Sequence, residues 1–449
     1  MLKLKYDVVV VGGGPAGCIA AKYAAKSGAS TLLLEEHSEI GEPVQCAGLL
    51  SRRAVEESEL RETKAFVNCE LKGAVLYPPS HALTHALAPA PSSAPSSAPS
   101  SAHASAHELR IESPPSSGKR AFAVSRSAFD KELARAAQKA GAEIILKTKV
   151  KAVKKKAGEA GKAGLTVSTA GEGEIGARVV VGADGVRSVV AKTAGAGREV
   201  TKNFLTCVQI EGKYEVDEPF AEIFVGRTVA PGFFAWAIPL GESSGTARIG
   251  LCIDRRFSPS PSPLPFLKKL LSNHPVVAKK FNGTRLNLTR LNLTAGRIPL
   301  ALPRPQTTVK TVKDGGAGVL LVGDAAAQVK PVTGGGVYYG LKCGKIAGQT
   351  AAKACLSGDA EVLREYEERW QKEIGQEIAF GLKIHRLRCV LSDRDFNALC
   401  KAVSKYDLTR LLTDYGDIDY PSLAFREVLK NPGIIKLMAK NVIKYLYAK

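Results

Sequence analysis

Three glycines near the start of the chain have the types and spacing that bind a dinucleotide. Gly12, Gly14 and Gly17 fit the G-x-G-x-x-G pattern directly after the apolar run of residues 8–11, with Ala16 inside the same turn. The first glycine permits a tight turn, the second lets a pyrophosphate approach the backbone, and the third lets a helix pack closely against a strand. The pyrophosphate then lies on free N–H groups at the positive end of the helix dipole. We therefore predict a cofactor-binding turn that includes all four residues.

A carboxylate at the right distance strengthens this prediction. Residues 31–34 predict a second strand ending at Glu35, about 20 residues past the glycines, where an acid can accept a hydrogen bond from a ribose hydroxyl. Consecutive valines in residues 8–11 predict a strand buried on both faces of a covered parallel sheet. A lone glycine pattern can be an ordinary turn, but strand, helix, strand and acid in register favour a dinucleotide site.

Two later turns again combine an acid with glycines after an apolar strand. Residues 182–188 read GADGVRS and place Asp184 after the predicted strand 178–181. Residues 323–326 read GDAA and place Asp324 after the predicted strand 318–322, with Pro331 and residues 334–336 (GGG) leading into a long helix. Three such turns, each just after a buried strand, point to one ligand.

The composition is that of a globular protein with a substantial core. The 449 residues are enough for two or three domains, and 45% are hydrophobic and 24% charged. No apolar run reaches the roughly 18 to 20 residues that span a bilayer, and the sequence enters its first strand without a signal peptide, so we expect a cytoplasmic protein. The nine cysteines form no C-x-x-C pair, so we predict no metal site and mostly buried free thiols.

The formal net charge of +20 favours anionic partners. Candidates are an acidic membrane surface, a phosphorylated substrate and an acidic electron carrier. No nucleic-acid motif accompanies the charge, so nucleic acid is not expected; ordinary solvation of surface charges is the alternative. Residues 431–449 place apolar side chains on one stripe with lysines opposite, which predicts a helix that docks on the body or contacts the inner face of the cell membrane.

Changes in pattern divide the chain into domains. Strands at 122–125, 143–153 and 165–169 and a helix at 126–140 continue the first pattern, whereas alternating strands at 205–214, 221–225, 233–238 and 246–253 predict an antiparallel sheet. Residues 88–107 are a Pro/Ser/Ala tract that we predict to be a disordered insertion. The predicted fold class is α/β: a Rossmann-type domain in three parts (1–70, 121–200 and 313–360), an interleaved substrate domain (71–120 and 201–312) and C-terminal helices (361–449).

Together the three turns resemble the fingerprints of the glutathione-reductase-type flavoproteins, in their hydroxylase-like branch, over residues 6 to about 355 apart from the insertion. The resemblance implies that the cofactor is FAD and that Asp324 binds its ribityl chain. It also implies that Gly336 and Val337 aim a helix N-terminus at the flavin, where the dipole stabilises the negative charge of reduced flavin. Further cofactor contacts implied by the resemblance are Arg126, Val150 and Asp184. A solvated helix residue is the alternative for Arg126.

Two further segments resemble the geranylgeranyl reductases, in particular the archaeal digeranylgeranylglycerophospholipid reductases. Residues 41–48 read GEPVQCAG and resemble that family's cysteine–glycine loop over the flavin, which implies FAD contacts for Cys46, Ala47 and Gly48. Residues 231–239 read PGFFAWAIP and resemble its aromatic-x-Trp-x-x-Pro strand along the lipid tunnel, which implies substrate contacts for Phe234, Trp236 and Pro239. The chain departs from the family where Phe234 replaces tyrosine, Ile238 replaces phenylalanine and Ala47 separates the cysteine from the glycine.

The resemblance implies FAD-dependent saturation of the geranylgeranyl C=C bonds of an archaeal ether phospholipid. Cys46 would place the alkene or relay a proton; the alternative is a packing cysteine in the FAD loop, and the aromatic residues are alternatively sheet core. Other functions on this fold are an aromatic hydroxylase or halogenase, a reductase of geranylgeranyl diphosphate or a related prenyl chain, and a flavin-holding protein without turnover. The electron donor stays open between ferredoxin and a reduced nicotinamide, because no second G-x-G-x-x-G region stands out.

Overall fold

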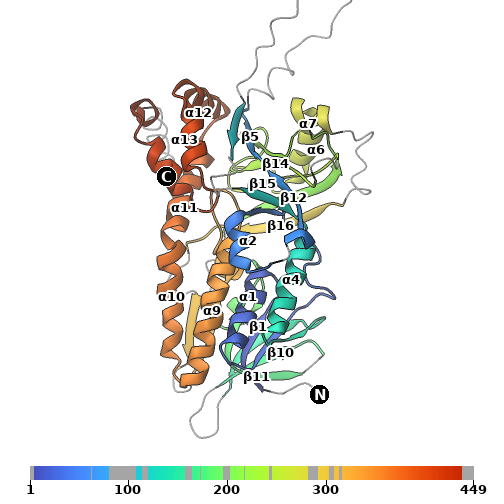
Figure 1. Cartoon of the computed structure of the whole chain (residues 1–449), viewed down its shortest axis with the longest axis vertical. Coiled ribbons are helices and arrows are strands. Elements are labelled where there is room, and N and C mark those ends of the chain that lie inside the picture. The colour runs from blue at the N-terminus through green and yellow to red at the C-terminus, as the bar shows by residue number, and fades with distance from the viewer. Residues whose placement is uncertain are drawn as a thin grey trace, which may run out of the picture.

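The computed structural model describes residues 5–61, 63–79, 108–113, 120–156, 164–171, 173–195, 203–216, 218–241, 245–281, 292–302, 308–312 and 316–436. The predicted insertion at 88–107 and most of the predicted amphipathic tail lie outside these ranges. Figure 1 shows the chain from its N-terminus in blue to its C-terminus in red, with the helices α9 and α10 along one side.

One largely parallel sheet carries the glycine turns. Its main path runs β17 (Val309–Val312), β18 (Ala317–Leu321), β11 (Glu174–Gly182), β1 (Lys5–Val11), β2 (Thr31–Leu34) and β8 (Glu143–Ile145). Neighbours on this path are parallel except β17, and β9 (Val150–Lys156) and β10 (Gly164–Thr169) extend β11 as antiparallel strands. The valines of β1 are buried, as the run predicts. Since β1, β11 and β18 are adjacent and parallel, their carboxyl ends bring the three turns to one edge.

Closely packed helices cover this sheet. α1 (Pro15–Lys26) lies against α4 (Arg126–Lys139) and the long α9 (Val337–Ser357). Gly340, Gly344 and Gly348 recur every four residues and so share one face of α9. A Cβ on Gly344 would lie 2.4 Å from the carbonyl oxygen of Ala16. The bare face therefore lets α9 approach α1 closely, which sets the N-terminus of α9 beside the first glycine turn.

The second sheet is mostly antiparallel, as predicted for residues 205–253. Its order is β16 (Thr294–Pro299), β12 (Phe204–Lys213), β15 (Thr246–Asp254), β14 (Phe234–Pro239), β13 (Phe220–Val225), β5 (Gly73–Tyr77) and β6 (Leu109–Glu112), with β13 and β5 parallel. One face packs on α6 (Leu264–Asn273) and α7 (Pro275–Lys280). The other face joins the core that includes α1 and α9. A small sheet of β3 (Leu49–Ser51), β7 (Ala121–Val124) and β4 (Val67–Leu71), with α2 (Arg52–Ser58), completes this region.

The C-terminal region is helical, as predicted. α10 (Arg364–Trp370) packs beside α9 and continues through the π-helical turn Gln371–Gly375 into α11 (Gln376–Val390). α12 (Asp393–Lys405), α13 (Leu408–Tyr415) and α14 (Pro421–Val428) follow. Figure 1 shows that α11, α12 and α13 rise from α10 to the level of the second sheet. Among the described helices, none has the length and apolar character needed to cross a bilayer.

The strand predicted over residues 143–153 is wrong in one respect, because the structure contains two strands there. β8 pairs with β2 in parallel, whereas β9 pairs with β10 in antiparallel orientation. The chain changes direction between them at Lys147, whose φ of 56° lies in the left-handed region. A single positive-φ residue breaks an extended run, and lysine gives no sequence sign of it.

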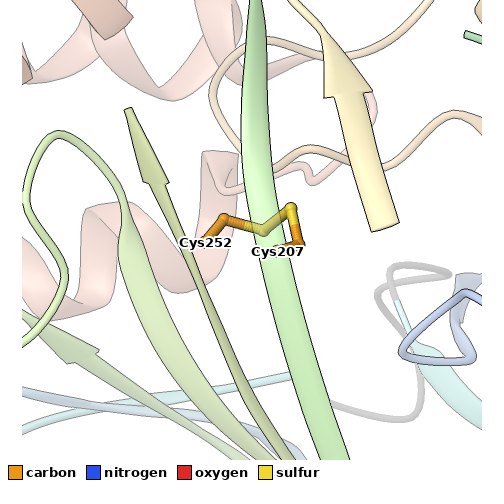
Figure 2. Close-up of a disulfide and its surroundings, with 2 residues drawn as sticks. All are labelled: Cys207 and Cys252. Carbon is orange, nitrogen blue, oxygen red and sulfur yellow. A yellow bond between two sulfur atoms is a disulfide. The ribbon is translucent and has the colours of Figure 1, made fainter. Parts of the chain in front are cut away.

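Cys207 and Cys252 form a disulfide, which corrects the expectation of mostly free thiols for this pair. They lie directly opposite each other on β12 and β15, with Cα atoms 4.0 Å apart (Figure 2). The pair is separated by 45 residues in sequence, so only the strand register brings it together. The remaining cysteines are not part of a disulfide, and all of them except the half-buried Cys46 are buried.

Candidate active site

The first glycine turn is formed by close backbone contacts that exclude side chains. A Cβ on Gly12, whose φ is +102°, would lie 2.4 Å from the carbonyl oxygen of Ala183, and one on Gly17 would lie 1.9 Å from the oxygen of Gly12. Gly14 caps α1 with no side-chain hydrogen bond, and no atom lies within 4 Å of its Cβ position. The turn is therefore closed on the protein side and open above the helix N-terminus, which is where a pyrophosphate would bind.

Glu35 lies at the end of β2 beside this turn. Its carboxylate accepts hydrogen bonds from the backbone N–H of Gly13 (2.7 Å) and of His37 (2.9 Å) and contacts His37 Nδ1 at 2.6 Å. A carboxylate has lone pairs beyond these bonds, so it can still accept from a ribose hydroxyl. The backbone N–H of Thr148 donates to the carbonyl of Glu35 (2.8 Å). Val150, the cofactor contact implied by the resemblance, begins β9 two residues later.

Asp184 follows β11 and forms hydrogen bonds within its own turn. Its carboxylate accepts from the Ser188 hydroxyl (2.6 Å) and from the backbone N–H of Val189 (2.7 Å) and Val190 (3.1 Å). It thus stabilises the start of α5 (Val189–Thr193), while its backbone lies against Gly12. Burial nevertheless raises the pKa of Asp184. Its side chain shapes the turn, and any contact with a cofactor would add to these bonds.

Asp324 lies where the third turn meets α9, and it has no such partners. Among the described residues, no donor bonds its carboxylate, and burial raises its pKa to about 6 against the opposing charge of Arg126. A Cβ on Gly336 would lie 3.1 Å from Asp324 Oδ1, and Val337 begins α9 directly after it. A desolvated acceptor beside an uncapped helix N-terminus is suited to hydroxyl donors such as those of a ribityl chain.

Arg126 connects the cofactor side to the Cys46 loop. Its guanidinium forms two hydrogen bonds with Asp130, of 2.9 and 3.1 Å, and lies beside the Cys46 thiol. Burial alone would lower the pKa of Arg126, but the carboxylate of Asp130 and the contact with Cys46 keep it above its ordinary value. Arg126 is thus a half-buried, paired cation at the site, which disfavours the alternative of a solvated helix residue.

Two side chains of the second sheet hold the loop formed by Cys46, Ala47 and Gly48. Gln209 Nε2 donates to the carbonyl of Cys46 (3.1 Å), and Arg248 Nη1 donates to that of Ala47 (2.8 Å). Arg248 is buried and also binds Glu211 through two hydrogen bonds, of 2.6 and 2.8 Å. A Cβ on Gly48, at φ +71°, would lie 2.3 Å from Arg248 Nη1. Sequence reasoning missed Gln209 and Arg248, which carry no motif.

The aromatic strand faces the same loop with two of its three predicted residues. Trp236 stacks across Gly250, where a Cβ would lie 2.6 Å from its ring, and the rings of Phe234 and Trp236 meet edge to face with centroids 6.3 Å apart. Within the described chain the buried Nε1 of Trp236 has no hydrogen-bond partner. Strand alternation puts Pro239 on the opposite face from Phe234 and Trp236, so its side chain is not part of this wall.

The C-terminal helices contribute charged residues that the sequence did not identify. The Lys330 ammonium pairs with Asp419 at 2.7 Å, both buried, just before the GGG segment. On α11, Arg388 donates to the carbonyl of Val332 (2.8 Å) and to His385 Nδ1 (2.8 Å). These side chains therefore fix the loop between Asp324 and α9 from outside. Their only sequence signal is their charge, and charged residues occur at many positions without function.

Asp254, His385 and Cys389 lie close enough together to resemble a metal-binding trio. Their donor atoms are already occupied: Asp254 receives two hydrogen bonds from Arg256, and His385 Nε2 contacts Asp254 at 3.1 Å. A metal on Nε2 would require a proton on Nδ1, but Arg388 donates to Nδ1. Two arginines at the cluster also oppose a cation, so this trio is a hydrogen-bonded network.

The residues present fit FAD. The turn of Gly12 and Gly17 leaves an open helix N-terminus for the pyrophosphate, and Glu35 is available to a ribose. Asp324 is a half-buried acceptor to which no donor in the described part of the chain bonds. These groups lie along one edge of the parallel sheet, where open α/β sheets bind ligands. The fold and these residues define a flavoprotein, and residues 5–255 match the family described as FAD binding domain.

Comparison with curated proteins narrows this class. The chain is 31% identical over 448 residues to digeranylgeranylglycerophospholipid reductase 2 of Methanopyrus kandleri, covering 98% of this chain and 100% of that protein. It is 31% identical to the digeranylgeranylglycerophospholipid reductase of Methanosarcina acetivorans, covering 90% of this chain and 91% of that protein. The chain belongs to the digeranylgeranylglycerophospholipid reductase family.

Solved structures agree with this fold. A geranylgeranyl bacteriochlorophyll reductase-like protein from Thermoplasma acidophilum superposes with a TM-score of 0.74 at 24% identity, covering 99% of this chain and 98% of that one. A flavin-dependent brominase superposes with a TM-score of 0.62 at 19% identity, covering 95% and 98%. Reductases and halogenases therefore share this architecture, so the fold alone does not distinguish the two activities.

Proposed function

We propose that this protein is an FAD-dependent reductase that saturates the geranylgeranyl C=C bonds of an archaeal ether phospholipid, a digeranylgeranylglycerol phospholipid. One observation carries the proposal: the Cys46 loop contacts Arg126 on the cofactor side and is bonded to the sheet of Trp236 on the other. Such a loop places a thiol between a flavin site and an apolar wall. Relatives at 31% identity that are named for this reaction support the substrate class.

The chemistry requires a proton as well as a hydride. Bound FAD supplies the hydride. An isolated alkene has no carbonyl to polarise, so positive charge develops at the more substituted carbon while a proton is delivered to its neighbour. Phe234 and Trp236 exclude water, and their ring faces stabilise that positive charge. The thiol of Cys46, held beside Arg126, is the group in this proposal that hands over the proton.

The test is an anaerobic turnover. The FAD-loaded protein is reduced with dithionite, mixed with digeranylgeranylglycerol phospholipid, and followed by flavin absorbance and lipid mass spectrometry. The expected result is flavin reoxidation with lipid mass rising in steps of two hydrogens. Cys46→Ala should slow this by roughly 100-fold, the size of a lost acid–base contribution, while the matched Cys400→Ala in α12 should not. Flavin that stays reduced until air is admitted would instead favour the hydroxylase or halogenase class.

The proposed electron donor is an acidic carrier protein of the ferredoxin type. The net charge of +20 favours such a partner over a nicotinamide, for which no second glycine fingerprint stands out. Anaerobic flavin reduction by ferredoxin should accelerate at low ionic strength. Rapid reduction by NADH or NADPH alone would replace this assignment with a nicotinamide.

We also propose contact with the membrane surface through the C-terminal helices. Five large apolar side chains between residues 406 and 435 are exposed: Tyr406, Tyr415, Leu423, Leu429 and Ile435. Lysines follow in the sequence at positions 436, 440, 444 and 449, and apolar side chains together with lysines favour anionic lipid. Sedimentation with anionic vesicles should show salt-dependent binding that Leu423→Asp weakens. Leu356→Asp changes a more exposed leucine at the end of α9 and should have no effect; equal binding by both variants would contradict this contact.

A further inference from the structure

Among the described residues the guanidinium of Arg388, whose Nε is buried, has no acidic partner, which is unusual for a cation inside a protein. Within the described residues it forms no ion pair, and its Nε has no hydrogen-bond partner. Its bonds go to the carbonyls of Val332 (2.8 Å) and Pro331 (3.4 Å) and to His385 Nδ1 (2.8 Å). Burial lowers the pKa of Arg388 to about 10, against the opposing influence of Cys389 and Asp254, so it is still charged at neutral pH.

The hydrogen-bond network around Arg388 keeps this charge from being neutralised. His385 accepts from Arg388 at Nδ1, which leaves its proton on Nε2, 3.1 Å from the Asp254 carboxylate. Burial lowers the pKa of His385, so the imidazole separates the arginine from the nearest carboxylate as a neutral spacer. Asp254 is meanwhile neutralised by Arg256, which forms two hydrogen bonds with it from the solvent side. Arg388, Arg256 and Asp254 together therefore carry one positive charge in excess, and it remains on Arg388.

This excess charge lies against the loop that leads into α9. Arg388 stacks on the ring of Phe233, with its guanidinium carbon 4.1 Å from the centroid, and the same ring lies 3.3 Å from the Cβ position of Gly334. Gly381, two turns earlier on α11, packs against Pro331, so the whole helix lies along this loop. One aromatic ring thus separates the cation from Gly334, two residues before Gly336, which the resemblance predicts to meet the flavin.

We propose that Arg388 is the counter-charge of the bound flavin: it stabilises the negative charge that reduction places on the pyrimidine end of the ring system. This inference rests on the FAD site of the proposed function and adds a residue that acts on the cofactor from outside the glycine motifs. A buried cation is costly until an anion joins it, and in a site of low dielectric the gain appears when the flavin is reduced. His385 acts through Arg388 as a positioning residue.

The experiment measures the flavin itself, in the absence of lipid, so that failure to reduce lipid leaves its outcome unaffected. FAD-loaded wild type, Arg388→Met and Arg388→Lys are compared by midpoint potential and by affinity for sulfite, which adds to oxidised flavin and creates the same negative charge. In Arg388→Met, sulfite should bind at least about tenfold more weakly. The potential should fall by about 30 mV for each tenfold change in the reduction equilibrium of a two-electron couple.

Two comparisons separate charge from folding. Arg388→Lys keeps the cation and should keep sulfite affinity within about threefold of wild type, although it loses the forked contact with the loop. Arg227→Met is the matched control, because Arg227 also donates to α11, at the carbonyl of Cys389 (2.9 Å), without contacting the loop. A potential and sulfite affinity in Arg388→Met equal to wild type would overturn the proposal, and so would an equal loss in the lysine and methionine variants.

Discussion

The two sides of the candidate site are built by opposite means. On the dinucleotide side, Gly12, Gly14 and Gly17 leave out side chains, so that backbone contacts form the turn and leave space for a ligand. We call the other side, made of the sheet of Trp236 and helix α11, the wall side. There, polar side chains donate to backbone carbonyls of other segments: Gln209, Arg248 and Arg388. Adding side-chain atoms to the glycine turns should therefore disrupt the dinucleotide side, whereas truncating the polar side chains should disrupt the wall side.

The largest effect is expected from adding atoms to the glycine turn. Gly17→Val should abolish FAD binding and destabilise the fold, because a Cβ there would meet the Gly12 oxygen at 1.9 Å. Gly14→Ala should leave the fold intact, since no atom lies within 4 Å of its Cβ position, yet weaken FAD on the order of 100-fold by filling the path of the pyrophosphate. Flavin fluorescence and urea unfolding measure the two effects, and unchanged FAD affinity in Gly14→Ala would refute an open phosphate site.

Removing the disulfide of the wall side should cost about 4 kcal/mol of unfolding free energy, the chain-entropy value for a loop of this length. The double variant Cys207→Ala, Cys252→Ala is unfolded in urea without reductant and compared with wild type. Wild type in the presence of a reductant serves as the control and should approach the variant. Nine titratable thiols in denatured, unreduced wild type would show that the bond does not form.

Asp324 allows a prediction in which stability and binding change in opposite directions. Burial raises its pKa from 3.8 to about 6, so the folded apoprotein binds a proton that the unfolded chain releases between these values. Stability should therefore fall as the pH rises through this window, and the full cost is present above pH 6. Asp324→Asn removes the cost and should stabilise the apoprotein at pH 7 by up to about 3 kcal/mol, at roughly 1.4 kcal/mol per pKa unit.

The same variant should bind FAD more weakly, because an amide is a poorer acceptor for the ribityl hydroxyls than a carboxylate. Thermal unfolding of apoprotein at pH 4, 6 and 8 tests the stability change, and flavin titration tests the affinity. Parallel pH profiles for variant and wild type would exclude Asp324 as the titrating group.

The difference between the two sides also explains what the sequence could reveal. The glycine turns were predictable because each depends on residues a few positions apart, whose conformational needs only glycine meets. Sequence likeness also pointed to Cys46 and Trp236, whose roles stay predictions. Gln209, Arg248 and Arg388 were not predictable, because their role depends on strand register and on the docking of α11, which join positions far apart in the chain. The disulfide between Cys207 and Cys252 was missed for the same reason.

The smallest predicted effect tests whether the second sheet only packs against the Cys46 loop or also positions it. Gln209→Ala removes a single neutral hydrogen bond to the Cys46 carbonyl, so it should lower the free energy of unfolding by about 1 kcal/mol. FAD affinity should change little, because Gln209 bonds the Cys46 loop and not the three glycine turns that would hold the dinucleotide. The lipid-dependent rate of flavin reoxidation should fall several-fold, since a small displacement of a catalytic group is costly even when binding is preserved.

The matched control is Thr206→Ala, on the same strand. It changes a side chain whose buried hydroxyl has no hydrogen-bond partner among the described residues. Equal reoxidation rates in the two variants would mean that the second sheet supports the loop without setting its geometry. The side chains of the wall side would then contribute to the stability of the fold and not to the reaction rate.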